Sequence, residues 1–221
     1  MIEAMARSYE ELGGLSRPRK TIRIETDRLV LRLPRLEDTP AAAEHLTDPE
    51  VMRFIGIGGQ TVPREACVEV VRKWLDRWQA NGFGQFAVER REDGRFLGRC
   101  GLLVWDRVGW CPSTLLEAAE PEIELGWTLA REHWGRGYAT EAASAVRQWA
   151  FGDLALERLI SIIHPDNLAS QRVALRLGAQ PDEVIETTHG PAVVWLHPLS
   201  VGSTELTKER RRRPRRRRSG T

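Results

Sequence analysis

The chain has 221 residues, 41% of them hydrophobic, so it is long enough to bury one substantial core. Its apolar runs fall far short of the ~20 residues that cross a bilayer, and its first residues contain no signal-peptide core, which predicts a cytoplasmic protein with no membrane partner. The formal net charge of +2 is unevenly spread, because nine basic and two acidic residues from Glu205 onward contribute +7 and leave −5 on residues 1–204.

Three segments are expected along the chain. Residues 1–20 show no sustained hydrophobic period and contain Gly13, Gly14 and Pro18, which is typical of a mobile leader. One folded domain is expected over residues 21–198. The remaining residues, 199–221, include an arginine block without apolar side chains, which predicts a basic disordered tail.

The first half of the domain carries both helical and strand periodicity. In chain order, we expect a strand at residues 28–33, helices at 37–46 and 63–79, and strands at 84–90 and 96–105. The two later strands flank a turn sequence and therefore form a predicted hairpin. Residues 106–121 have no firm period, so we expect a loop there, close to the substrate.

The second half carries stronger signals. In chain order, we expect a strand at residues 122–129, a glycine-rich turn, a helix at 137–151, a strand at 158–163, a helix at 168–177, and strands at 181–186 and 193–196. A strand, a glycine-rich turn, a helix and a further strand form a crossover unit with a pocket of phosphate size.

The glycine-rich turn is the first candidate binding site. Small residues at Gly135, Gly137 and Ala139 allow the backbone to approach a ligand, and unpaired amides at the start of the next helix attract an anion. Arg136 could add a full positive charge at the rim. The spacing matches neither the GxGxxG nor the GK[ST] phosphate motif. Taken alone, this turn indicates either a diphosphate site or close packing of a helix on a strand.

With its neighbours, the turn resembles the GNAT superfamily of N-acetyltransferases. Pro121-Glu122-Ile123-Glu124-Leu125-Gly126-Trp127-Thr128-Leu129 precedes the turn, Asn167-Leu168-Ala169-Ser170 begins a later helix, and Thr26-Asp27-Arg28-Leu29-Val30-Leu31-Arg32 lies near the start. Over residues 21–198, the order and spacing resemble the RimJ/RimL-like branch, typified by ribosomal-protein N-terminal acetyltransferases. The resemblance implies a mixed α/β fold: a mostly antiparallel sheet of six or seven strands, with a splayed parallel pair and flanking helices.

The resemblance also implies acetyl-CoA as the acyl donor and assigns residues to its binding. The backbone of Trp127, Thr128 and Leu129 would pair with the pantetheine arm. Asn167 and Ser170 match positions beside the thioester and the CoA sulfur, although Asn167 could simply cap its helix. The amides that would hold the pyrophosphate belong to Trp134, Gly135, Arg136, Gly137, Tyr138, Ala139 and Thr140. We expect the Tyr138 side chain to pack rather than to act as an acid.

The implied reaction is direct attack of a neutral primary amine on the thioester carbonyl. Glu124 is the favoured base, directly or through water, but Glu122 lies on the same strand face, and either could instead attract a cation or pair with an arginine. Ser170 is the candidate acid for the departing thiolate, or only a hydrogen-bonding or packing residue. At pH 7, deprotonation costs about 1 kcal/mol for an α-amine of pKa near 7.7 and about 4.6 kcal/mol for a lysine of pKa near 10.4. A protein N-terminal α-amine is therefore the easier acceptor.

The sequence is also compatible with other functions. A small polyamine or an aminoglycoside could be the acceptor, in keeping with the acidic residues 1–204. In a different class, the chain could bind ribosomes or RNA through Arg210–Arg218, with a CoA-sensing fold. Trp105, Trp110 and Trp195 could either wall the acceptor pocket or fill the core. We expect a monomer or a homodimer.

The cysteines and histidines form no recognisable metal site. Cys67, Cys100 and Cys111 lack CxxC spacing, and no pair of histidines shares a helical face. We therefore expect neither a disulfide framework nor a metal ion.

Overall fold

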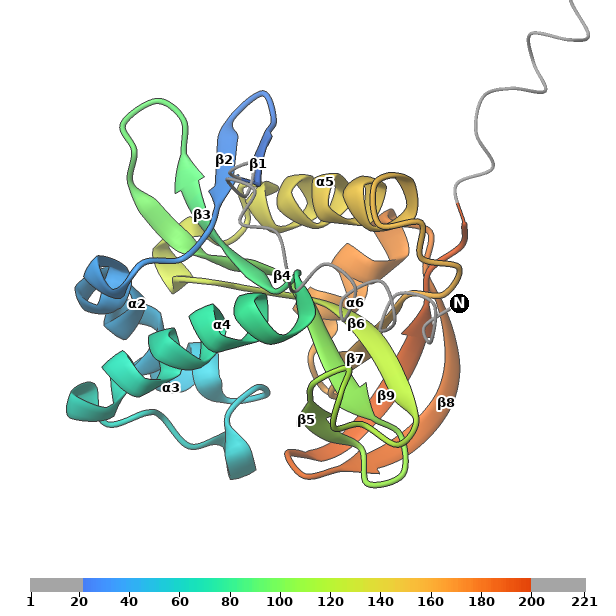
Figure 1. Cartoon of the computed structure of the whole chain (residues 1–221). Helices are drawn as coiled ribbons and strands as arrows, with labels where there is room; N and C mark the ends of the chain where they lie inside the picture. The colour runs from blue at the N-terminus through green and yellow to red at the C-terminus, as the bar shows by residue number, and fades with distance from the viewer. Residues whose placement is uncertain (1–21, 200–221) are drawn as a thin grey trace, which may run out of the picture.

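A nine-stranded mixed sheet runs through residues 22–199, the part of the chain that the computed structural model describes (Figure 1). The strands lie in the order β1-β2-β3-β4-β6-β7-β9-β8, and β5 pairs with β4 off this path. Only the β6·β7 pair is parallel among these described strands. The mixed α/β fold with a mostly antiparallel sheet is thereby confirmed. The expected leader, and all of the expected tail except Leu199, lie outside the described residues.

The helices and strands follow the expected order, with ends that differ by a few residues. They are β1 (Arg23–Glu25), β2 (Leu29–Arg32), α2 (Thr39–Leu46), α3 (Pro49–Met52), α4 (Cys67–Asn81), β3 (Gln85–Arg90), β4 (Phe96–Asp106), β5 (Cys111–Ser113), β6 (Pro121–Leu129), α5 (Tyr138–Gly152), β7 (Ile160–Ile163), α6 (Leu168–Arg176), β8 (Gln180–Thr187) and β9 (Gly190–Leu196).

Two short strands raise the count above the expected six or seven. β1 and β5 have three residues each, too few to show a period of two along the chain. β5 lies inside the span expected to be a loop, and its pairing with β4 sets Pro112 opposite Trp105. Proline is tolerated here because β5 is a short strand off the main path of the sheet. Pairing with β4, rather than local sequence, makes this segment a strand.

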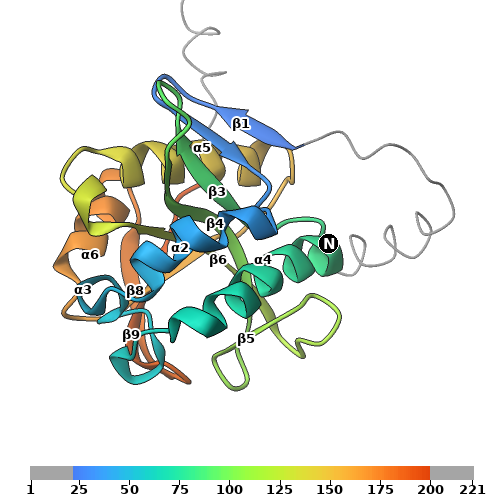
Figure 2. The same ribbon diagram turned by 90° about the vertical axis from the view of Figure 1, so that its left-hand side faces the viewer.

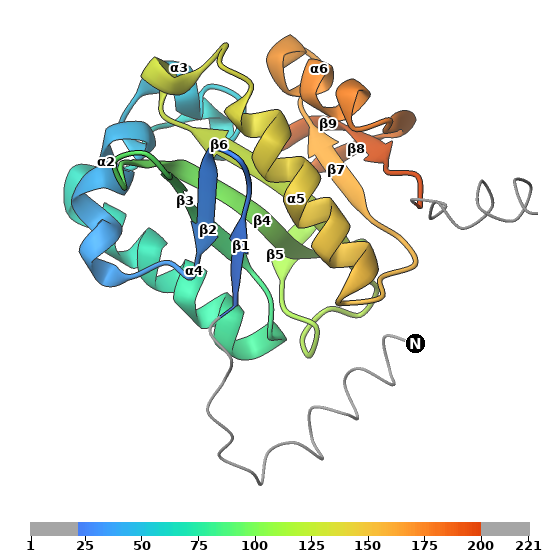
Figure 3. The ribbon, with the colours of Figure 1, turned by 90° about the horizontal axis from the view of Figure 1, so that it is seen from above.

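Helices cover both faces of the sheet. α5 and α6 lie on one face, whereas α2 and α4 lie on the other (Figures 2 and 3). α5 is held by a stripe of small buried residues that includes Ala142, Val146 and Ala150, and α4 buries Val71, Trp74 and Trp78 at helical spacing. None of the helices within residues 22–199 is long and apolar enough to cross a bilayer.

A buried ion cluster ties β2 to its neighbours. Arg32 donates to both carboxylate oxygens of Asp38, at 2.8 and 2.6 Å, and its Nε donates to Glu89 on β3 at 2.7 Å. Asp38 also accepts from the Arg35 amide at 2.8 Å. The hydrogen bond to Asp38 is the main cause that raises the pKa of Arg32, so this guanidinium stays charged. The cluster fixes the chain where it leaves the sheet for α2.

The parallel strands β6 and β7 meet at one point and then separate. Their only paired residues are Glu124 and Ile160. One residue further along, the Ser161 hydroxyl donates to the Leu125 carbonyl at 2.6 Å, where a side chain takes the place of a strand amide. Beyond that point, Trp127 packs against both the main core and the smaller core beneath β7 and β9. The sheet therefore opens from Glu124 onward, as the resemblance implied for this pair.

Candidate active site

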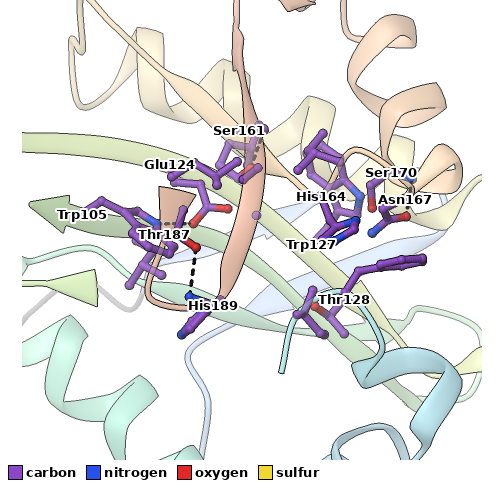
Figure 4. A pocket seen from close by; sticks show the side chains of 18 of the residues that line it. Trp105, Glu124, Trp127, Thr128, Ser161, His164, Asn167, Ser170, Thr187 and His189 are labelled. Carbon is purple, nitrogen blue, oxygen red and sulfur yellow. Dashed lines mark hydrogen bonds between the residues drawn. The ribbon is translucent and has the colours of Figure 1, made fainter. Parts of the chain in front are cut away.

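A pocket of about 120 Å³ fills the opening between β6 and β7, and we call it the β6–β7 pocket (Figure 4). Its walls come from β3, β4, β6 and β7, the start of α6, the β8–β9 hairpin, and Phe54 and Ile55 after α3. This volume is below the roughly 300–1,000 Å³ of pockets that enclose drug-sized ligands. The pocket therefore has room for reacting groups rather than for a whole large substrate.

The labelled side chains fall into two groups across the pocket. Trp105, Glu124, Thr187 and His189 gather on one side, and Trp127, Thr128, His164, Asn167 and Ser170 gather on the other (Figure 4). Five of the residues proposed from the sequence thus line one pocket: Glu124, Trp127, Thr128, Asn167 and Ser170. Leu129 and the turn at residues 134–140 do not line it.

Glu124 is held at the point where the strands part. Its Oε2 accepts a hydrogen bond from Trp105 Nε1 at 2.6 Å. Burial raises the pKa of Glu124, and the Trp105 hydrogen bond and the charge of Arg99 partly oppose this rise. The result is a carboxyl group that faces the pocket and holds its proton more tightly than an exposed glutamate does.

Glu122 lies in a different environment, although it is only two residues away. It is 5% exposed and accepts from Arg158 Nε at 2.8 Å. It does not line the β6–β7 pocket. The ion pair occupies its carboxylate, so the geometry separates two glutamates that strand alternation left equivalent.

Asn167 caps the helix that carries Ser170. The Asn167 Oδ1 accepts from the Ser170 amide at 3.1 Å, which is the standard bond of a helix N-cap. Both side chains also line the pocket, opposite Glu124. The capping interpretation of Asn167 is therefore correct, and it fixes the position of Ser170 at the pocket wall.

The glycine-rich turn presents free amides next to the start of α5. Gly135 and Gly137 have φ angles of 72° and 80°, in the left-handed region that glycine adopts at little cost. Within residues 22–199, the amides of Gly135, Arg136 and Gly137 donate no hydrogen bond to another backbone group. Three free amides beside the positive end of a 15-residue helix fit an anion such as a diphosphate.

Two hydrogen bonds reduce the number of backbone groups that are free to bind acetyl-CoA as the resemblance implied. The Trp134 amide already donates to the Arg131 carbonyl at 3.1 Å, so it is not free to bind a phosphate. The Trp134 indole donates to the Leu129 carbonyl at 2.8 Å, so this carbonyl already has a hydrogen-bond donor within the protein. Tyr138 is 8% exposed, with the Arg28 guanidinium 4.7 Å from its ring centroid, so its side chain packs as expected.

Several pocket residues were not anticipated from the sequence. No residue of 106–121 lines the pocket, whereas the β8–β9 hairpin contributes Thr187 and His189. Of the three tryptophans considered, only Trp105 lines the pocket, while Trp110 and Trp195 pack in the smaller cores. Arg99 could have been noticed, because it is a lone charge in a strand that is otherwise apolar up to Trp105.

Comparison with known proteins gives a family match over most of the domain. The sequence profile described as an acetyltransferase (GNAT) domain matches residues 28–180. The uncharacterized N-acetyltransferase YoaA of Bacillus subtilis is 27% identical over 162 residues, which cover 73% of this chain and 85% of YoaA.

Solved structures agree with this match. An acetyltransferase from Agrobacterium tumefaciens is 30% identical with a TM-score of 0.65, and the alignment covers 84% of this chain and 99% of that one. RimL, a ribosomal alpha-N-protein acetyltransferase in complex with coenzyme A, has a TM-score of 0.63 at 13% identity, with 80% of this chain and 98% of RimL covered. At that identity, the similarity to RimL concerns the fold.

Proposed function

This chain belongs to the GNAT acetyltransferase family, and we propose that it transfers an acetyl group from acetyl-CoA directly to a primary amine, with an α-amine as the first candidate. Family membership makes the chain an acyltransferase, because enzymes of this fold use acetyl-CoA. The observation that carries the proposal is the position of Glu124, which faces Asn167 and Ser170 across one pocket where β6 leaves β7.

The described residues fit the parts of acetyl-CoA. The free amides of the turn, at Gly135, Arg136 and Gly137, would hold the pyrophosphate at the start of α5. Trp127 and Thr128, on β6 beyond its contact with β7, would pair with the amide-bearing arm. Acetyl-CoA supplies the thioester whose carbonyl carbon the amine attacks. Backbone amides of β6 would stabilise the negative charge that develops on the carbonyl oxygen.

Glu124 would accept the proton that the amine loses. Burial raises the pKa of this carboxyl group, which makes its ionised form a better proton acceptor than an exposed glutamate. Ser170, on the opposite wall, would donate a hydrogen bond or a proton to the departing thiolate. An α-amine is partly neutral at pH 7 and needs a weaker base than a lysine does, so it is the better match for a carboxylate base.

A polycationic acceptor is less compatible with the same pocket. Arg99 lines it, and Arg77 on α4 lies close enough to act electrostatically on Glu124 and Arg99. These two positive charges would repel a polyamine or an aminoglycoside. The ribosome-binding alternative depends on Arg210–Arg218, which lie outside the described residues.

The proposal is tested by titrating the full chain with acetyl-CoA in a calorimeter and by following CoA thiol release with a panel of amines and peptides. We expect saturable binding of acetyl-CoA and thiol release that depends on a primary amine. Absence of binding with the ligand in excess would contradict the assignment of the donor. Binding without transfer to any amine would contradict the proposed reaction.

A further inference from the structure

Arg99 is a buried cation on the wall of the β6–β7 pocket. It projects from β4, and its Nε is buried without a hydrogen-bond partner among the described residues. Its Nη1 donates to the side-chain oxygen of Gln85 on β3, and its guanidinium carbon lies 5.6 Å from the centroid of the Trp74 ring. Burial lowers the pKa of Arg99 to about 10, which still leaves it charged at neutral pH.

No carboxylate within residues 22–199 forms an ion pair with this guanidinium. Arg77, which adds a second positive charge nearby, has no ion pair in the same range either. His189, which also lines the pocket, cannot act as a counter-ion. Burial and the positive charges of Arg77 and Arg99 lower its pKa, which favours the neutral imidazole. With Glu124 ionised, the charges of Arg99 and of nearby Arg77 together still exceed it by one positive charge.

A buried charge without a counter-ion is costly, and a purely structural role does not require one. A neutral side chain could fill the space beside Trp74, and Gln85 could be satisfied by a neutral donor. Glu124 and Arg99 form no ion pair and act on one another only at a distance, while the Glu124 carboxylate accepts a hydrogen bond from Trp105 at 2.6 Å. Arg99, which has no ion pair among the described residues, and the proposed base Glu124 both line the β6–β7 pocket.

We propose that Arg99 binds a carboxylate of the acceptor, so that the enzyme acetylates an amine whose own residue carries a carboxylate. A polypeptide that begins with aspartate or glutamate combines this carboxylate with an N-terminal α-amine of low pKa, whereas a free amino acid has the carboxylate but a more basic amine. The acceptor carboxylate supplies the counter-ion that Arg99 lacks, and the guanidinium fork can hold it through two hydrogen bonds. This inference rests on the proposed function and adds its substrate class.

The test uses the full chain at saturating acetyl-CoA and measures CoA thiol release with matched acceptors. One arm compares L-amino acids with their C-terminal amides and with the corresponding decarboxylated amines. The other arm compares peptides that begin with Asp or Glu against peptides that begin with Asn or Gln. We expect kcat/KM for the preferred carboxylate-bearing acceptor to exceed that of its amide on the order of 100-fold, mostly through KM. The arm that shows the difference identifies the source of the carboxylate.

Two variants connect the preference to Arg99. Arg99→Gln should reduce the ratio of carboxylate to amide acceptor to near one, whereas Arg99→Lys should keep part of it. The matched control is Arg72→Gln, which removes a charge from the exposed surface of α4 and should keep the full ratio. Thermal melts check that each variant folds. If Arg99→Gln does not fold, the wild-type ratio and Arg99→Lys still decide the question.

The outcomes separate this inference from the proposed function. Equal use of acids and amides, or a ratio that Arg99→Gln leaves unchanged, would overturn the role of Arg99 while acetyl transfer to amines stands. Transfer to amides or polyamines but to no carboxylate-bearing acceptor would do the same. Failure of every amine, with acetyl-CoA bound, would overturn the proposed reaction and the inference with it.

Discussion

At the scale of single residues, Glu124 lies between influences that move its pKa in opposite directions. Burial raises it, while the Trp105 hydrogen bond and the charges of Arg99 and Arg77 lower it. The net rise makes the carboxylate a stronger base but shifts the pH range in which it is ionised. The activity should therefore depend on pH in a way that its neighbours can tune.

Replacing Glu124 by glutamine should lower kcat/KM by about 10² to 10⁴ if this carboxylate is the general base. In the wild type, the base is lost as the pH falls through the raised pKa, so the acid limb should lie above the ordinary range of a glutamate. Glu124→Gln should remove this limb. Exposed Glu117→Gln is the control and should leave the profile intact. An unchanged pH–rate profile in Glu124→Gln would exclude Glu124 as the base.

Trp105→Phe should move the acid limb to higher pH and largely retain the plateau. The substitution removes the Nε1 donor that favours the ionised Glu124, so its pKa should rise further. Trp195→Phe is the matched control, because the buried Trp195 Nε1 has no hydrogen-bond partner among the described residues. The measurement is kcat/KM against pH. A limb that stays in place in Trp105→Phe would show that this hydrogen bond does not set the pKa.

At the scale of elements, the turn before α5 combines a binding surface with a demanding backbone. Gly137 has a φ of 80°, and a Cβ atom there would lie 3.3 Å from Arg28 Nη2. Arg28 in turn pairs with Glu141 on α5 at 2.6 Å and donates to the Arg136 carbonyl at 2.9 Å. Arg28, the residue before β2, thus holds the turn whose amides are proposed to bind the pyrophosphate.

Gly137→Ala should therefore weaken acetyl-CoA binding and destabilise the fold by roughly 1–2 kcal/mol, the cost of a left-handed residue with a Cβ. Gly152→Ala, at the other end of the same helix, has no left-handed φ and no atom within 4 Å of the added Cβ, so it should be neutral or stabilising. Calorimetric affinity and urea unfolding give the two quantities. Equal acetyl-CoA affinity in both variants would argue against a binding role for the turn.

The ion cluster of β2 predicts a larger effect on stability. Arg32→Gln would leave Asp38 and Glu89 without their buried partner, so the free energy of unfolding should fall by roughly 3–5 kcal/mol. Arg64→Gln is the control, because it leaves only the exposed Glu44 without its partner, and the expected change is about 0–1 kcal/mol. Urea denaturation at pH 7 measures both. A small loss in Arg32→Gln would mean that water or rearrangement compensates the carboxylates.

At the scale of the whole molecule, charge is divided along the chain. Deleting residues 205–221 removes a charge of +7 and should leave acetyl-CoA turnover unchanged, because the pocket and the turn lie within residues 22–199. Retention on RNA at low salt should fall, since nine basic side chains are lost. Filter binding at several salt concentrations and thiol release measure the two effects. Loss of turnover together with retention would contradict a simple tether.

The order of the elements could be predicted because each depends on nearby residues. The buried positions of α4 recur at helical spacing, and the paired glycines before α5 mark a turn with left-handed backbone. The resemblance to GNAT proteins required only this order and spacing. β1 and β5 could not be predicted, because three residues show no period and their strand structure comes from pairing with β2 and β4.

The composition of the candidate site was decided by the tertiary structure. Glu122 and Glu124 share a strand face, yet Arg158 pairs with one while Trp105 and the opening of β6 from β7 single out the other. Arg99 and His189 reach the same pocket from β4 and from the β8–β9 hairpin, far apart along the chain. Local spacing along the chain was enough to predict the longer helices and strands and the glycine-rich turn before α5. Only the packed sheet determined which charges meet, because burial and distance between remote side chains set their pKa values and their partners.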